Sequence, residues 1–160
     1  MKKALIFTIS SLMMIAFLSS CGDKQVKPTV GSGNDLVLDQ INKQVKGFSI
    51  DGFSGGSANL NQNEDLENMK KIVTVVKPII DKMPDGYAMQ VKGHCADYDG
   101  PAKQKSVSTA RAKKVYDELK KAGVAESKIT YKGVGIAEPI PGVSLKDFSQ
   151  RRVTFEAIKK

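Results

Sequence analysis

A stripe of apolar residues between positions 66 and 83 constrains the fold most strongly. Its members recur three or four residues apart, which is the spacing along one face of an α-helix. Asn63 can cap the first turn, and Glu64 and Asp65 place negative charge where the helix dipole favours it. Pro78 interrupts the pattern and predicts a kink just before it. The sequence therefore predicts a long helix with one buried face. The stripe consists of Leu66, Met69, Ile72, Val73, Val76, Ile80 and Met83.

The segments that follow alternate between strand and helix patterns. Residues 87–93 alternate side chains between two faces, which predicts a strand. Residues 102–122 carry apolar side chains at helical spacing and stop before Gly123, which predicts a second long helix. Residues 128–135 and 151–158 have the alternation of two further strands.

The segment upstream of the stripe completes the predicted architecture. Residues 36–45 have the pattern of a short amphipathic helix, and strand-like residues follow at Phe48, Ile50 and Phe53. Leaving that first helix aside, the order is strand, helix, strand, helix, strand, strand. This order predicts an α+β sandwich with two long helices packed on one face of a small mixed sheet.

The first 20 residues predict an export signal. Lys2 and Lys3 precede an uncharged apolar run at 4–18, which is short for a membrane span and ends in small residues. The letters LSSC, ending at Cys21, resemble the lipobox of bacterial lipoproteins. That resemblance implies cleavage before Cys21 and attachment of lipid to its thiol and its new amine. The alternative is an ordinary signal peptide followed by an unrelated cysteine.

The remaining sequence predicts a tether and one domain. Residues 21–34 are rich in Gly, Ser, Pro and polar side chains, which predicts a flexible tether before a domain at 35–160. With Cys21 lipidated, Cys95 has no intrachain partner, so no disulfide framework is expected.

Removing two signal-peptide lysines lowers the formal net charge from +8 to +6, which suits an anionic surface such as a wall polymer. Nucleic acid is not an expected partner, because the basic residues are dispersed and lack interleaved aromatics.

The segment GHCADYDGPAKQKSVSTARA, residues 93–112, gathers the chemically active side chains. Catalysis by His94 and Cys95 is disfavoured because neighbours on a strand point to opposite faces, and no second histidine could complete a triad. A metal site is disfavoured because no second Cys or His cluster exists and DYDGP offers too few oxygens for calcium. Asp97 and Arg111 could bind the ammonium and carboxylate of an amino acid, or they could pair with each other. The residues alone leave these two readings equal.

Several linked motifs resemble the OmpA-like peptidoglycan-binding domain. They are VKGHCADYDG, then QKSVSTARAKKVYDELKKAGV, then KITYKGVGIAEPI, and finally SQRRVTF. The family pattern is a strand ending Gly-His-Thr-Asp-x-x-Gly, a helix with Asn-x-x-Leu-Ser-x-x-Arg-Ala, a Gly-x-Gly strand end and a closing Asn-Arg-Arg-Val. The resemblance extends over about residues 53–155. The motif sequences are especially similar to those of the spirochaete lipoprotein version of this domain.

The resemblance implies a ligand and a pair of residues that hold it. The family binds the diaminopimelate of cell-wall stem peptides without a covalent bond. Arg111, in STARA, is then expected to hold the carboxylate, and an aspartate after the Gly-His strand end to hold the amine. A gap-free alignment from His94 would put Ala96 at the aspartate position. Anchoring on Asp-x-x-Gly instead assigns Asp97, with Asp99 as the alternative.

Other matched positions are secondary candidates for binding. Gln104 and Ser108 lie in the helix motif, Gln104 in place of the family's asparagine. Cys95 stands near the family's threonine, and Arg151 is the first arginine of the closing motif. His94 is expected to have a structural hydrogen-bonding role at the strand end.

Together the sequence predicts a non-enzymatic lipoprotein that tethers the outer membrane to peptidoglycan. Its domain is expected to face the periplasm, to contact the membrane through lipidated Cys21, and to need no cofactor or metal. The alternative is a surface-exposed lipoprotein that binds host or partner macromolecules and has a degenerate peptidoglycan pocket. A hydrolase that uses His94 is a third reading.

Overall fold

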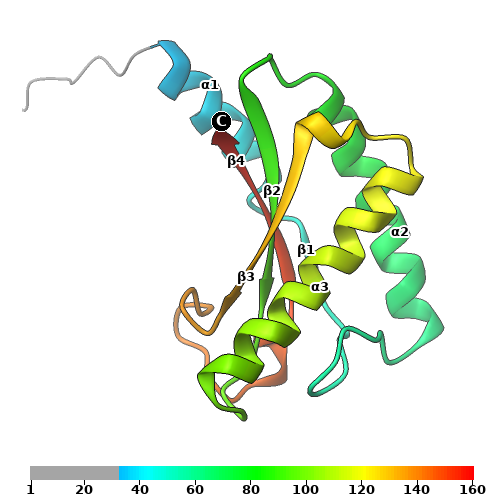
Figure 1. Ribbon diagram of the computed structural model, residues 1–160, viewed down its shortest axis with the longest axis vertical. Helices are drawn as coiled ribbons and strands as arrows, with labels where there is room; N and C mark the ends of the chain where they lie inside the picture. The colour runs from blue at the N-terminus through cyan, green and yellow to red at the C-terminus, as the bar shows by residue number, and fades with distance from the viewer. Residues whose placement is uncertain (1–32) are drawn as a thin grey trace, which may run out of the picture. The chain divides into compact units, whose positions relative to one another are not determined.

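The computed structural model describes residues 33–160. The predicted signal peptide, the lipidation site Cys21 and the tether up to residue 32 lie outside the described residues. The main elements are α1 (Gly33–Val45), β1 (Ser49–Ile50), α2 (Asn63–Asp81), β2 (Tyr87–His94), α3 (Pro101–Lys121), β3 (Ile129–Gly135) and β4 (Val153–Lys159), with 3₁₀ turns at Glu126–Lys128 and Phe148–Gln150 (Figure 1).

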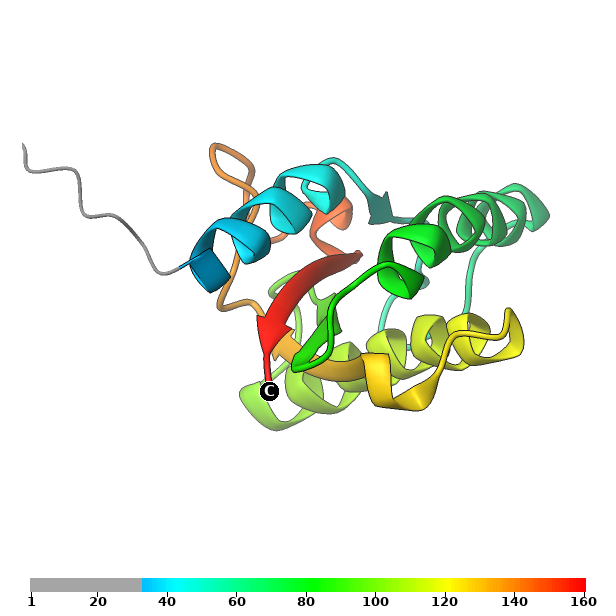
Figure 2. The same cartoon turned by 90° about the horizontal axis from the view of Figure 1, so that it is seen from above.

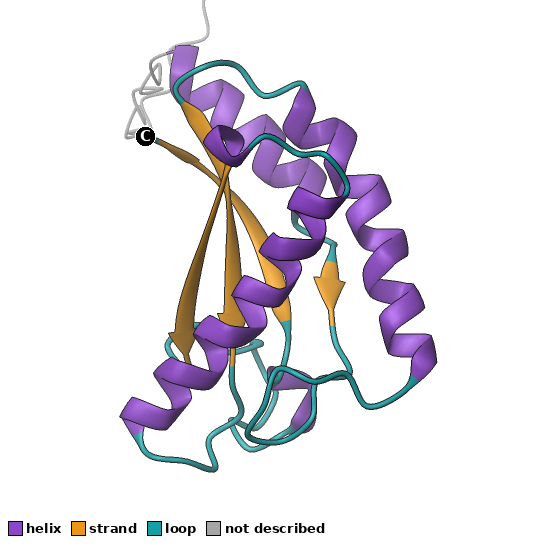
Figure 3. Ribbon diagram, turned by 45° about the vertical axis from the view of Figure 1, so that its right-hand side comes forward, coloured by secondary structure: helices purple, strands orange, loops and turns teal. Residues whose placement is uncertain are grey.

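The strands between residues 33 and 160 form a four-stranded mixed sheet in the order β1-β4-β2-β3. β2 runs parallel to β3 and antiparallel to β4, and β1 is antiparallel to β4. The long helices α2 and α3 lie side by side on one face of this sheet (Figures 1 and 3). The predicted α+β sandwich is therefore confirmed. No helix in the described part of the chain is long and apolar enough to cross a bilayer.

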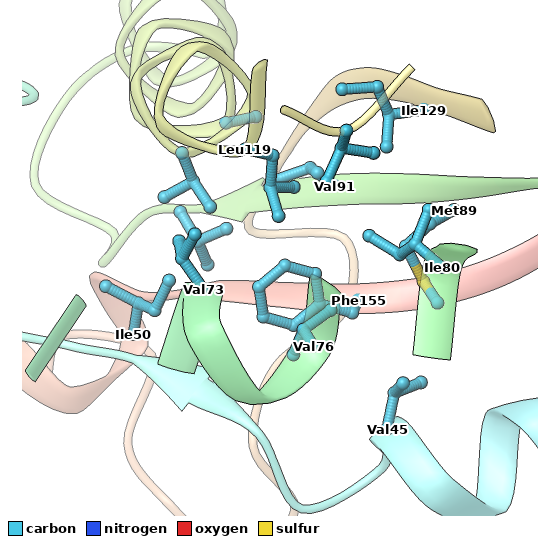
Figure 4. Packing of buried hydrophobic residues seen from close by; sticks show 14 of the residues in the cluster. Val45, Ile50, Val73, Val76, Ile80, Met89, Val91, Leu119, Ile129 and Phe155 are labelled. Atoms are coloured by element: carbon cyan, nitrogen blue, oxygen red, sulfur yellow. The ribbon is translucent and has the colours of Figure 1, made fainter. Parts of the chain in front are cut away.

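The predicted apolar stripe of α2 packs against the sheet. Met69, Val73, Val76 and Ile80 are all buried there, as the helical spacing requires. From α3, Leu119 enters the same layer and is fully buried. Figure 4 shows Val73, Val76, Ile80 and Leu119 gathered with labelled residues of β2 and β4. Each large aliphatic side chain buried in this way stabilises the fold by about 1.5–3 kcal/mol.

Two glycines let α3 approach the sheet closely. A Cβ atom at Gly93 of β2 would lie 1.9 Å from the main-chain oxygen of Ser108. At Gly133 of β3, a Cβ would lie 2.4 Å from the main-chain nitrogen of Thr109. Any larger residue would therefore push the helix outward. The depth at which the first half of α3 sits is set at these two positions.

The helix α1 protects an edge of the sheet. β1 pairs with β4 only through Ser49 and Ile50, so the far part of β4 lacks a partner strand on that side. The side-chain amide of Asn42 occupies that edge. It donates to the main-chain oxygen of Ala157 at 3.2 Å and accepts from the main-chain nitrogen of Ala157 at 2.7 Å. The amide thus replaces one rung of a missing strand. Figure 2 shows α1 lying beside β4.

Details at the ends of elements differ from the sequence prediction. The predicted strand through Phe53 stops at Ile50, because Gly52 adopts a φ of 83° and turns the chain out of the sheet. Phe53 then forms only an isolated bridge with Leu60. The last strand starts at Val153, after the arginine pair.

The start of α2 is also shifted by one residue. Gln62, and not Asn63, is the capping residue. Its main-chain N–H donates to the carboxylate of Asp65 at 3.1 Å. At the other end, the helix remains continuous through Pro78.

Candidate ligand-binding site

Arg111 is the most deeply buried charged residue at the end of the sheet where β2 stops. It projects from α3, and only 1% of its surface is exposed. Its Nε donates to the carbonyl of Ser57 at 2.9 Å, and Nη2 donates to that of Ser54 at 2.8 Å. Nη1 donates to the carbonyl of His94 at 2.8 Å and approaches the Cys95 Sγ at 3.5 Å. These bonds fix the guanidinium between the end of β2 and the loop after β1.

The charge of Arg111 is not neutralised by these contacts. All the acceptors it contacts are carbonyls or a buried thiol, so none supplies a negative charge. A guanidinium has five N–H donors, and the four contacts leave one for a further acceptor. Burial lowers the pKa of Arg111, but an arginine side chain remains protonated at neutral pH. The mutual pair of Asp97 and Arg111, left open by the sequence, is not formed.

A cavity of about 260 Å³ opens beside this guanidinium. Its wall carries the positive charges of Arg111, Arg151 and Lys103 and the negative charge of Asp99. The whole lining consists of Gly55, Gly56, Cys95, Ala96, Tyr98, Asp99, Lys103, Val107, Arg111 and Arg151.

The two candidate aspartates occupy different environments. Asp97 is half-buried and does not belong to the cavity lining. Its Oδ1 accepts a hydrogen bond from the Gln104 Nε2 at 2.9 Å, and its main-chain N–H donates to Leu145 at 2.8 Å. Asp99 shares the cavity with Arg111, and its Oδ1 is paired with the Lys103 ammonium at 2.9 Å.

Gln104 and Ser108, two secondary candidates on α3, form hydrogen bonds to the main chain near the site. Gln104 is buried and, besides Asp97, its amide also donates to the main-chain oxygen of Asp99. The Ser108 Oγ accepts from the main-chain nitrogen of Gly135 at 3.1 Å and donates to Lys105 at 3.0 Å. Both residues lie outside the cavity lining, and both tie α3 to loops or strands that form the site.

Cys95 and Arg151 do line the cavity. The Cys95 thiol is 7% exposed and donates to the main-chain oxygen of Gln104 at 3.3 Å. Burial raises the pKa of Cys95, so the neutral thiol is favoured and nucleophilic chemistry is disfavoured. The Arg151 guanidinium carbon lies 5.4 Å from the centre of the Tyr98 ring, within range of a cation–π contact.

His94 has a structural place behind the site. It is 1% exposed, and its Nε2 lies 2.8 Å from the Thr154 Oγ1. Burial, together with the positive charges of Arg152 and Lys92, lowers the pKa of His94 to about 3. The imidazole is therefore neutral at ordinary pH. Its main chain contributes directly to the site by accepting from Arg111.

Sequence reasoning missed Tyr98 and Lys103 as cavity residues. A usable signal existed for Lys103, because Asp99 lies four residues before it, just ahead of the predicted helix at 102–122, and four residues is ion-pair spacing. No pattern pointed to Tyr98. Within residues 33–160, no three His, Cys, Asp or Glu side chains cluster closely enough to hold a metal ion.

The fold and cavity define an α+β domain with a mostly cationic pocket at the end of its central strands. The family model described as OmpA family matches residues 52–152, which is more than half of the chain. This protein belongs to the OmpA family.

Solved structures agree with this fold. The C-terminal domain of MotB from Helicobacter pylori matches with a TM-score of 0.56 and 21% identity, over 71% of this chain and 85% of that one. The OmpA-like domain of FopA1 from Francisella tularensis subsp. tularensis SCHU S4 matches with a TM-score of 0.56 and 22% identity, over 69% of each chain. A search of curated proteins gave no match.

Proposed function

We propose that this protein is a non-enzymatic lipoprotein that binds peptidoglycan without a covalent bond and tethers the outer membrane to it. The observation that carries the proposal is the buried Arg111 guanidinium, which has no anionic partner and lines a cavity with a carboxylate on its wall. A ligand with both a carboxylate and an ammonium group suits such a cavity. The diamino acid of wall stem peptides has both, and the motifs of the OmpA family support that choice.

Within the proposed site, Arg111 receives the ligand carboxylate. The N–H donor that its contacts leave can form a charge-assisted hydrogen bond to the carboxylate, and such a bond is about twice as strong as a neutral one. The ligand would supply the negative charge that the carbonyls of Ser54, Ser57 and His94 do not. Arg151 adds a second positive charge at the cavity wall.

For the ligand ammonium we propose Asp99 in place of the sequence-based first choice, Asp97. Support for Asp99 comes from its place in the cavity lining beside Arg111. Asp97 already receives a hydrogen bond from Gln104, and we assign it the positioning of the loop.

Pelleting with purified sacculi tests the proposed function and its residues. The full-length chain, kept in mild detergent, is expected to sediment with sacculi. Arg111→Lys is expected to bind at least about tenfold more weakly, because one ammonium group cannot replace the guanidinium that is fixed by the carbonyls of Ser54, Ser57 and His94. Asp99→Asn is expected to weaken binding more than Asp97→Asn does. Asp117→Asn is the matched control, since Asp117 is paired with Lys113 on the outside of α3.

The outcomes separate the assignments. Wild type that stays in the supernatant contradicts the proposed function. A larger loss for Asp97→Asn than for Asp99→Asn returns the ammonium site to Asp97. Circular dichroism and thermal melting of each variant show whether a loss of binding reflects a loss of folding. Sacculi that release soluble fragments on incubation with wild type would contradict the non-enzymatic assignment.

The membrane anchor and its side of the membrane are tested separately. We propose Cys21 as the acylated residue, so mass spectrometry of the mature N-terminal peptide is expected to show lipid on it. Cys21→Ala is expected to move the protein from the membrane fraction to the soluble fraction. Protease treatment of intact cells is expected to leave a periplasmic domain uncut, whereas rapid cleavage would favour the surface-exposed alternative.

A further inference from the structure

Among residues 33–160, the one carboxylate on the cavity wall already has a cationic partner from the same chain. The Lys103 Nζ lies 2.9 Å from the Asp99 Oδ1, and both residues line the cavity. Asp99 lies two residues before the start of α3 and Lys103 lies in its first turn, so the two residues are four apart. Arg111, in contrast, has only uncharged acceptors. Within the described residues, the carboxylate end of the proposed ligand site thus has a charged partner, and the guanidinium end contacts uncharged groups.

The Gly55–Gly56 turn leaves room for this arrangement. A Cβ at Gly56 would lie 3.9 Å from the Lys103 Nζ, and a Cβ at Gly55 would lie 3.4 Å from an Arg151 Nη1. Cationic side chains therefore border the turn on both sides. With Lys103, Arg111 and Arg151 against one carboxylate, the wall has an excess of positive charge.

From this arrangement we infer that Lys103 is an internal competitor of the ligand ammonium at Asp99. The inference rests on the proposed function, because it concerns the same site. An ammonium on a ligand must displace the Lys103 ammonium to reach the carboxylate, whereas a ligand carboxylate meets no such competitor at Arg111. The carboxylate of a ligand then contributes more to its affinity for the pocket than its ammonium group does.

The competitor can be displaced because its ion pair is accessible to water. The Lys103 side chain is 60% exposed and that of Asp99 is 31% exposed. Pairs this exposed are weak, and a long lysine side chain can turn away into solvent at little cost. Lys103 therefore lowers the affinity for an amine-bearing ligand without closing the site to it.

The test compares two small ligands that differ only in their amines. Meso-diaminopimelic acid has two carboxylates and two ammonium groups, and pimelic acid has the same chain and carboxylates without amines. Binding of each to the full-length protein in detergent is measured by calorimetry or by NMR shifts, for wild type and for Lys103→Gln. Lys113→Gln is the matched control, because it removes the same charge from an i,i+4 ion pair within α3 and away from the cavity.

Competition predicts opposite changes for the two ligands. Lys103→Gln is expected to bind diaminopimelic acid about two- to fivefold more tightly, since an exposed pair of this kind is worth that much. It is expected to bind pimelic acid equally or more weakly, because a positive charge has been removed. Lys113→Gln is expected to leave both affinities unchanged. This combination supports the inference.

Failure of the inference differs from failure of the proposed function. If wild type sediments with sacculi but Lys103→Gln weakens both ligands, or matches Lys113→Gln, competition at Asp99 is wrong and the proposed function stands. If wild type binds neither sacculi nor diaminopimelic acid, and Lys103→Gln does not bind them either, both are overturned.

Discussion

The two halves of α3 bury different kinds of side chain. The first half buries Gln104, Ser108 and Arg111, and the second half buries Val115 and Leu119. In the first half the side chains contact the backbone through directed hydrogen bonds. In the second half they pack without directional demands. A single helix thus provides stability at one end and a positioned charge at the other.

The difference teaches where change is tolerated. Apolar packing stabilises in proportion to the area buried, and it accepts a neighbour of similar volume. A buried guanidinium held by three carbonyls accepts almost no substitute, because each lost partner leaves a polar group unpaired. Mutations in the apolar half are therefore expected to lower the free energy of unfolding, and mutations in the polar half are expected to weaken ligand binding.

The largest effect is expected in the apolar half. Leu119→Ala removes a fully buried side chain and leaves a cavity, so the free energy of unfolding is expected to fall by about 2–5 kcal/mol. Urea denaturation measures this loss. At a temperature where the variant is still folded, its binding to sacculi is expected to match wild type. A folded variant that no longer bound would show that the two halves of α3 are not independent.

The second-largest effect is expected from acid, which lowers the free energy of unfolding through His94. The pKa of His94 is lowered to about 3, below the ordinary value of 6.5, so the folded state favours the neutral ring. Stability from this residue is full above pH 6.5 and is lost as the pH falls toward 3. Between pH 6.5 and 4.5, wild type is expected to lose about 2–3 kcal/mol more than His94→Gln does. Urea denaturation at both pH values gives the comparison, and equal losses for the two proteins would contradict it.

Gly93→Ala is expected to disturb both halves at once. The added Cβ would overlap the main-chain oxygen of Ser108, so α3 must move outward. We expect a loss of about 1–3 kcal/mol in unfolding free energy, and weaker binding to sacculi because Arg111 moves with the helix. Gly47→Ala is the control, since a Cβ there meets nothing within 4 Å. Unchanged binding in a destabilised Gly93→Ala variant would separate the depth of the helix from the site.

The smallest effect is expected where directed bonds lie far from the cavity. Asn42→Ala removes both hydrogen bonds to Ala157 and uncovers the edge of β4. A loss of about 1–2 kcal/mol is expected from denaturation curves, with unchanged binding. Light scattering is expected to show more self-association, because the freed edge can pair with another chain. A variant that stayed monomeric after mild heating would argue against the protective role of this amide.

Much of the fold could be predicted because its elements are amphipathic. The stripe along α2 specifies one buried face, which the structure confirms. In β2 the predicted face of Tyr87, Met89 and Val91 is buried, and Ala88 and His94 on the opposite face are buried as well. The short strand β1 was predicted too long, because its end depends on the turn at Gly52 and on how Asp65 packs beside it. Local patterns do not contain such contacts between distant segments.

The site was less predictable than the fold. A buried position for Arg111 agrees with its motif, although its three carbonyl acceptors could not be foreseen because backbone acceptors leave no mark in a sequence. Which aspartate faces the cavity depends on the path of the loop after β2. Contacts of Asp97 with Gln104 and Leu145 determine that path. Neither contact follows from spacing alone.

The contacts of Arg111 also have a mechanical consequence. A ligand held on this guanidinium would pull on α3, and the carbonyls of Ser54, Ser57 and His94 would pass the tension to two other parts of the chain. A pull from a membrane anchor would enter through α1, which Asn42 fastens to β4. In the proposed tether, force would therefore cross the sheet from β4 to β2 through a ladder of hydrogen bonds. Under load, that ladder shares the strain among many bonds, so the first element expected to detach is α1.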